Sequence, residues 1–467
     1  MAMGKRQGER QSDLWVPVTE MPQAPGHPFY RKLNQLLAQH GFDSFVEGLC
    51  QPLYHDSLGR PSIPPGVYFR MLLIGYFEGI DSERGIAWRC ADSRTLSEFL
   101  GYGLRDSTPD HSSLSRIRQR IDLERHEEVF TWVLKRLGET GLLKGQTIGI
   151  DATTLEANAA MRSIVRKDTG EGYLEFLTGL AKASGIETPT REDLAKLDRK
   201  RKHKASNRDW ENPHDPDAKI TKMKDGRTHL GHKAEHAVDL QTGAIVAVTL
   251  QPADRGDCQS LAETLDVTVE ALASVATDAQ AGEPRCTSGS GQLLAETVTD
   301  KGYHSNETMA DQQALGIRTY CSEPERKGRR KWQGQADAQA AVYANRRRIG
   351  GQRGKGLLRK RGELLERPFA HCYETGGMRR THLRRHSNIL KRLLIHVAGF
   401  NLGLAMRKVF GIGKPRRAQD GLAGTILGIF EGLVRVLAAM GRGWSLLRRI
   451  WMCPGAPATR IASAAAA

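Results

Sequence analysis

Apolar residues recur every three or four positions between Phe29 and Gly141, and glycines and prolines mark the breaks. The spacing of Val67, Met71 and Leu72 is typical. We predict an all-helical domain over residues 28–141, preceded by a polar, proline-containing flexible lead-in over residues 1–27. The expected helices span residues 29–40, 64–78, 83–91, 94–101, 111–121 and 124–139.

The periodicity changes to that of strands after residue 145. A short apolar run ends at Asp151, and residues 232–252 alternate on either side of Gln241-Thr242-Gly243, which indicates two strands joined by a tight turn. This order predicts a mixed α/β core over residues 145–410. Further expected elements are a helix over 260–272, a strand over 296–300, a helix over 306–315, a strand over 317–321, and helices over 356–370 and 386–409.

Two charged insertions interrupt this core, at residues 160–225 and 325–355. The part from Arg191 to Lys224 has little apolar content and is expected to be solvated. Residues 416–467 are predicted to form a C-terminal helix and a disordered tail. The apolar stretch from Leu422 to Met440 is interrupted by Glu431 and Arg435, which favours a packed amphipathic helix over a membrane span.

The net charge of the chain points to a negatively charged partner. The 467 residues include 69 Lys+Arg against 53 Asp+Glu, a net charge of +16, and a hydrophobic share of 39% excludes disorder throughout. Residues 326–361 hold 13 basic residues and one acid, Asp337, which favours binding to a nucleic acid over a merely solvated loop. The seven cysteines form no C-x-x-C pair and the N-terminal residues lack an apolar signal segment, so we expect a cytoplasmic protein.

Three acids occupy positions that suit a metal site. Asp151 and Asp300 each end a predicted strand, and Glu366 lies in the predicted helix ELLERPF. Carboxylates suit Mg²⁺ or Mn²⁺, although spacing alone favours ordinary turn and surface residues. His229, His232 and His236 suggest zinc, but residues three apart on a strand point to opposite faces, so packing in the hairpin is favoured.

The order of several motifs resembles one protein family. TIGIDATTLEANAA, VTDKGYHS, RGELLERPFAH and LLIHVAGFNLGLAMRKVFGIGKPR are similar to successive motifs of bacterial insertion-sequence transposases of the DDE class, in the branch related to the IS-four and IS-five groups. The helical segment from Ser62 to Ile121 is similar to the domain that precedes the catalytic core in that family. The resemblance covers most of residues 29–415 and implies an RNase H-like core behind a helical DNA-binding domain.

The resemblance also implies the site and its chemistry. Asp151, Asp300 and Glu366 would be the catalytic acids and would hold two Mg²⁺ ions, with Mn²⁺ as a substitute. Glu363, with Arg359 at the spacing of the family's Arg-x-x-x-Glu element, is the alternative third acid. Tyr373 stands where the family has a lysine or arginine, which leaves a phosphate contact to Arg367, Arg379 or Arg380.

The implied function is metal-dependent cleavage and strand transfer at the ends of the element, on double-stranded DNA and as a homodimer on that DNA, in a nucleoid-associated cytoplasmic protein. A catalytically decayed DNA-binding protein and an RNase H-like nuclease without strand transfer stay open as alternatives. Basic and hydroxyl side chains in the fifth predicted helix and in or near the basic segment, residues 326–361, are the candidate DNA contacts. They are Ser115, Arg116, Arg118, Arg120, Arg346, Arg347, Arg348, Lys355, Arg359 and Arg367.

Overall fold

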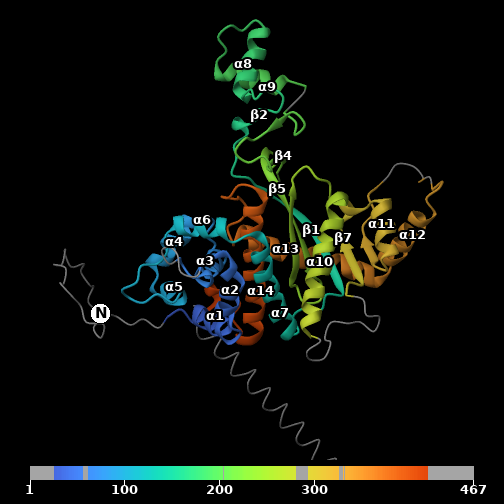
Figure 1. The fold of residues 1–467 in the computed structure, drawn as a ribbon. Coiled ribbons are helices and arrows are strands. Elements are labelled where there is room, and N and C mark those ends of the chain that lie inside the picture. Colours follow the sequence, from blue (N-terminus) through green and yellow to red (C-terminus); the bar gives the residue numbers. More distant parts are fainter. Residues whose placement is uncertain are drawn as a thin grey trace, which may run out of the picture.

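The structure is a computed structural model that describes residues 26–55, 62–202, 205–223, 225–279, 293–325, 330 and 332–418. Its N-terminal region is helical (Figure 1). Side chains at the residue before a helix fix several starts: Ser82, Asp110 and Asp122 each accept a hydrogen bond from a backbone N–H of the first turn. The α-helices here are α1 (Pro28–Gln39), α2 (Phe42–Cys50), α3 (Pro65–Glu78), α4 (Glu83–Asp92), α5 (Arg94–Phe99), α6 (His111–Arg120) and α7 (Leu123–Glu139).

A six-stranded mixed sheet follows, in which the order is β4-β5-β1-β7-β8 and β6 pairs with β5. Strand β1 is antiparallel to β5 and parallel to β7, and β7 is parallel to β8. The predicted turn lies between β5 and β6, where Gly243 has a φ of 79° that favours glycine. The strands are β1 (Thr147–Glu156), β4 (Lys219–Lys222), β5 (Thr228–Asp239), β6 (Ile245–Pro252), β7 (Glu296–Thr299) and β8 (Arg318–Cys321).

Helices cover both faces of this sheet. Glu235 on β5 accepts a hydrogen bond from Thr264 of α10, whereas the neighbouring His236 contacts Phe369 of α13. Because adjacent strand residues point to opposite faces, α10 and α13 lie on opposite sides of the sheet. The helices of this part are α10 (Asp257–Ala279), α11 (Asn306–Ala314), α12 (Ala336–Gly350), α13 (Gln352–Phe369), the π-helix η5 (Ala370–Glu374) and α14 (His386–Phe410).

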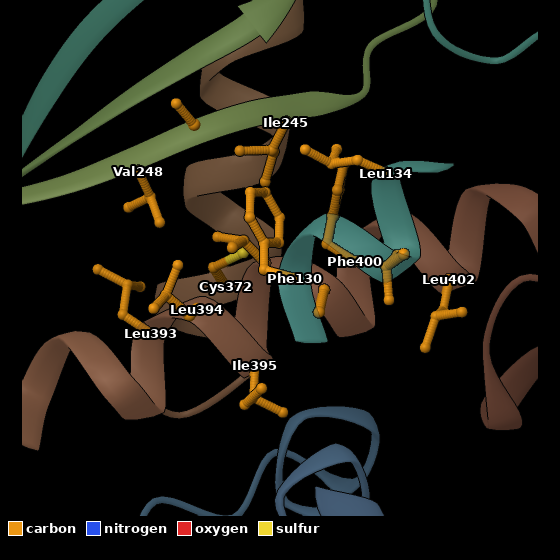
Figure 2. Packing of buried hydrophobic residues seen from close by; sticks show 14 of the residues in the cluster. Phe130, Leu134, Ile245, Val248, Cys372, Leu393, Leu394, Ile395, Phe400 and Leu402 are labelled. Atoms are coloured by element: carbon orange, nitrogen blue, oxygen red, sulfur yellow. The ribbon is translucent and has the colours of Figure 1, made fainter. Parts of the chain in front are cut away.

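Helix α14 joins the helical region to the sheet. It packs against α7 and α3 on one side and against β6 on the other, and Figure 2 shows Phe130 of α7, Ile245 of β6 and Phe400 of α14 in one cluster. The side chain of Asn401 bonds both backbone groups of Ile245, at 3.0 and 2.7 Å. By length and composition α14 passes as a membrane span, but 89% of its apolar window is buried, as in the core helix of a soluble protein. The stretch from Leu422 to Met440 lies outside the described residues.

The first insertion forms an arm that projects from the sheet beyond β4 (Figure 1). It contains α8 (Tyr173–Ala183), α9 (Arg191–Lys200) and a two-stranded sheet of β2 (Val165–Arg166) and β3 (Trp210–Glu211). Its apolar residues form two small clusters separate from the main core. The stretch expected to be solvated is therefore partly ordered, because α9 places Leu194 against α8.

The predicted fold class is confirmed: helical N-terminal region, mixed RNase H-like sheet and C-terminal helices. The structure differs in detail, since α2 and α12 were not predicted and α13 begins at Gln352 rather than at residue 356. Strand β5 begins at Thr228, and from Leu230 onward every residue of it is buried. Its polar positions are therefore not solvated, contrary to what the alternating pattern suggested: Lys233 and Glu235 contact α10, whereas His236 contacts α13 on the other face.

Candidate active site

Asp151 and Asp300 lie at matching positions on neighbouring parallel strands. Gly149 of β1 pairs with Val298 of β7, and each aspartate comes two residues after its member of that pair. Parallel strands are about 4.8 Å apart and every second side chain shares a face. The two carboxylates therefore meet on one face, at the carboxyl end of β7.

Arg361 of α13 bridges the two aspartates. Its guanidinium lies 2.8 Å from an oxygen of Asp151 and 3.9 Å from an oxygen of Asp300. Its Nε also donates to the carbonyl of Ile150, at 3.4 Å. The Arg361 side chain is only 13% exposed, so this cation is held between helix and sheet.

Burial is the largest influence on the first acid, and it raises the pKa of Asp151 above its usual value. Arg361 and the backbone N–H of Ala152 oppose this shift, while the charges of Asp300 and Asp257 add to it. Asp257 begins α10 and forms a 2.7 Å ion pair with Lys233. Sequence reasoning missed this acid, although it directly follows the Arg255-Gly256 turn after the predicted hairpin.

The two candidates for the third acid are both exposed on α13. Glu363 pairs with Arg367 at 3.1 Å. A helix turns about 100° per residue, so Glu363 lies roughly opposite buried Leu365, whereas Glu366 flanks the buried face. Glu366 therefore lies nearer the buried face than Glu363, and neither forms a three-ligand cluster with the aspartate pair.

Tyr373 packs in the interior of the protein and is not exposed at the site. It is fully buried in η5, and its hydroxyl lies 2.6 Å from Nε2 of His236, which pairs across the sheet with Asp151. Burial lowers the pKa of His236 to about 3, so this imidazole is neutral. Arg379 lies over the Tyr373 ring and donates to the Thr153 hydroxyl at 3.1 Å, two residues beyond Asp151. Of the three arginines considered for the missing phosphate contact, Arg379 thus lies against β1 near Asp151 and also pairs with Glu374, while Arg380 pairs with Glu156 farther along β1.

Two family models match the chain. One, described as a transposase domain (DUF772), matches residues 18–120, and the other, a transposase DDE domain, matches residues 199–402. The chain is an insertion-sequence transposase of the DDE class. The second match contains Asp300 and Glu366, while Asp151 lies between the two matched ranges. The search of curated proteins and that of solved structures gave no match.

The transposase is therefore an enzyme of metal-dependent DNA phosphoryl transfer. Its two strand-borne carboxylates fit a divalent cation, because one positive group, the Arg361 guanidinium, already contacts both. Among the residues that the structure describes, no group of three or more His, Cys, Asp or Glu side chains is arranged to hold a metal ion. The histidines of the hairpin have separate partners: His232 pairs with Asp215, His236 with Tyr373 and His229 with Asp225.

The candidate DNA contacts on α6 are partly engaged within the transposase. Arg118 forms an ion pair with Glu83 and donates to Ser115, and both ion-paired side chains are largely buried. Arg120 stacks over the ring of Tyr54. Arg116 is exposed, and within the part of the chain that the structure describes its hydrogen bond is to Ser112 of its own helix. Of the arginines on α6, Arg116 and Arg120 are therefore the exposed ones.

The basic segment divides in the same way. Arg346 forms a two-pronged ion pair with Glu323, and Arg348 donates to the backbone and hydroxyl oxygens of Thr319, at 2.9 and 3.0 Å. These two arginines anchor α12 to the end of the sheet. Of the candidate DNA contacts in this segment, Arg347, Lys355 and Arg359 are exposed on α12 and α13.

Proposed function

We propose that this transposase binds the ends of its insertion sequence, cleaves the DNA there and joins the liberated ends to target DNA. The observation that carries the proposal is the pair of carboxylates at matching positions of β1 and β7, both in contact with one cation. Carboxylates fixed by backbone pairing keep their separation while the substrate changes, which suits two successive transfers at one site.

Asp151 and Asp300 would bind the metal, and Glu366 would complete the ligand set from α13. When bound there, Mg²⁺ would stabilise the attacking and leaving oxygens of an in-line displacement. In cleavage, water attacks the phosphorus and the 3′ oxygen leaves, taking up a proton; in joining, that 3′-OH loses its proton, attacks a target phosphate and displaces the 3′ oxygen of the same target strand. Arg379, held beside β1 by Thr153, is the residue best placed to contact the phosphate in place of the family's lysine or arginine.

DNA would follow the exposed cations. Arg347, Lys355 and Arg359 offer phosphate contacts on the outer side of α12 and α13, and Arg116 does so on α6. Pairing two ends in one complex requires two copies of the chain, so we infer a homodimer on DNA. Chromosomal DNA as substrate places the protein in the cytoplasm, at the nucleoid.

The test is cleavage and joining of DNA that carries the ends flanking the gene, with Mg²⁺, by the wild type and charge-neutral variants. Asp151→Asn and Asp300→Asn should each lower the rate about a thousandfold or more, since each removes a charged ligand at the reacting phosphate. Glu366→Gln should do the same. Glu363→Gln is the matched control, three residues earlier on the same helix, and should retain most activity.

Other results separate the alternatives. Activity that survives Glu366→Gln but is lost in Glu363→Gln would move the third ligand to Glu363. Cleavage without joining of a pre-cut end would indicate a nuclease. Specific binding of the ends by a wild type that neither cuts nor joins would identify a catalytically decayed DNA-binding protein.

A further inference from the structure

Arg361 neutralises the aspartate pair from within the protein. Its guanidinium contacts Asp151 and Asp300 at 2.8 and 3.9 Å, and its side chain is 13% exposed. Each of these oxygens belongs to a residue that we propose as a metal ligand. A divalent cation and the guanidinium would therefore compete for the same carboxylates.

The neighbouring cations of α13 do not share this position. Arg359 and Lys360 are exposed, and Arg353 pairs with Glu296 at the far end of β7. Arg367 pairs with Glu363 on the outer side of the helix. Among the described residues of α13, Arg361 is the one that forms ion pairs with Asp151 and Asp300.

The helix that carries Arg361 also carries Glu366. The two residues differ by about 140° around the helix axis, so the same orientation of α13 does not point both at the aspartates. Pro368 lies within α13 and the π-helix η5 follows it at Ala370. Both features interrupt the regular hydrogen bonds of a helix and are common where helices bend or change register.

We propose that Arg361 is an internal counter-cation: it holds Asp151 and Asp300 in place and has to withdraw before a divalent cation binds them. This inference rests on the proposed function, because it takes the two aspartates as metal ligands. Arg361 thereby sets the metal affinity of the site. Its withdrawal accompanies the movement of α13 that brings Glu366 to the aspartates.

The experiment measures Mn²⁺ binding by calorimetry and by the EPR signal of free Mn²⁺, on the full chain without DNA. Arg361→Gln should bind Mn²⁺ at least about tenfold more tightly than the wild type, since an opposite charge at this distance shifts carboxylate equilibria by one to three powers of ten. Lys360→Gln removes the same charge from the adjacent exposed position and should leave the affinity unchanged. Arg361→Gln combined with Asp300→Asn should lose the tight binding.

Suppose that Arg361→Gln binds Mn²⁺ as weakly as the wild type, or more weakly, and that Asp300→Asn still abolishes the binding. This result would contradict the role of Arg361 as a counter-cation, while the two aspartates would remain the metal ligands. Binding insensitive to Asp300→Asn in every variant would instead contradict the proposed function. If Arg361→Gln does not fold, Arg361→Lys serves as the test. It keeps a charge but loses the planar contact, so it should bind Mn²⁺ more tightly than the wild type, and equal affinity would reject the proposal.

A second measurement follows unfolding by heat. Without metal, Arg361→Gln should unfold at a lower temperature than the wild type, because the aspartates repel each other. Saturating Mn²⁺ should raise the unfolding temperature of Arg361→Gln by more than that of the wild type, since tighter binding stabilises the folded state more. A larger rise in the wild type would contradict the inference.

Discussion

The candidate site has a sheet side, with Asp151 and Asp300, and a helix side, with Glu366 and Arg361 of α13. Different interactions position the residues of the two sides. Asp151 and Asp300 take their places from the backbone pairing of β1 with β7, which fixes their separation residue by residue. Glu366 takes its place from a helix whose orientation depends on side-chain packing, such as Leu365 against Gly149, and on the ion pair of Arg361. The proposed ligand set therefore has two members positioned by the sheet and one positioned by the helix.

The largest effect on stability is expected where α13 packs against β1. A Cβ at Gly149 would lie 2.7 Å from side-chain atoms of both Leu240 and Leu365. Gly149→Val should therefore push α13 away from β1 and lower the free energy of unfolding by about 3 kcal/mol, measured by urea denaturation. Gly362→Ala on the same helix has no atom within 4 Å of its Cβ and should stabilise, by at most about 1 kcal/mol. Similar stabilities for both variants would show that α13 does not rest on β1 through this contact.

A smaller effect on stability is expected from the buried contact between His236 of β5 and Tyr373 of η5. His236 is neutral in the folded protein, with a pKa of about 3, and would take up a proton near pH 6.5 when unfolded. The unfolded state therefore binds more protons between these values, so the stability is complete above pH 6.5 and is lost as the pH falls. At pH 5 the loss is about 2 kcal/mol for this histidine.

Urea unfolding at several pH values between 7 and 5 measures this loss. His236→Gln should make the slope shallower by about one proton. His126 and His396 are also buried, with pKa values of about 4 and 3, and should keep the remaining slope. An unchanged slope in His236→Gln would mean that this side chain is not buried as a neutral group.

The smallest effect on stability is expected at the outer side of α13. Lys355→Gln and Arg359→Gln should change the free energy of unfolding by less than about 0.5 kcal/mol, yet each should reduce the salt dependence of DNA binding by about one unit of slope. Arg348→Gln is the contrast, since its contacts with Thr319 are internal and its loss should destabilise the protein. A full salt slope in the Lys355 and Arg359 variants would place the DNA elsewhere.

The sheet side of the site was predictable from the sequence, because strand periodicity and the ends of strands are local signals. The tight turn at Gly243, most of the helices and the place of Asp300 directly after β7 follow from them. Strand β1, however, continues past Asp151 to Glu156. The choice of the two aspartates as catalytic acids came from the family resemblance and stays a prediction. Helix α12 was missed, because its sequence ADAQAAVYANRRRIG has no clear apolar stripe and is anchored by Glu323 and Thr319, more than twenty residues away.

The helix side was less predictable, for the same physical reason. Arg361 is one of thirteen basic residues in its segment, and only the three-dimensional position distinguishes it from exposed Lys360. From the sequence, Tyr373 was interpreted as replacing the family's lysine or arginine. In the structure it is buried against His236, a contact that depends on the packing of η5 on β5. Long-range partners of this kind leave no periodic trace in a sequence.

The position of α14 between α7 and β6 bears on how such elements can evolve. The helical region and the sheet share one hydrophobic interior, closed by a helix that comes last of the three in the chain. A recombination event that exchanged only the first 140 codons with a distant element would pair α7 with a foreign α14 and leave mismatched apolar surfaces. New N-terminal helical regions in this lineage are therefore expected to arise by point substitution, or by exchange of the whole gene, rather than by shuffling of the N-terminal part.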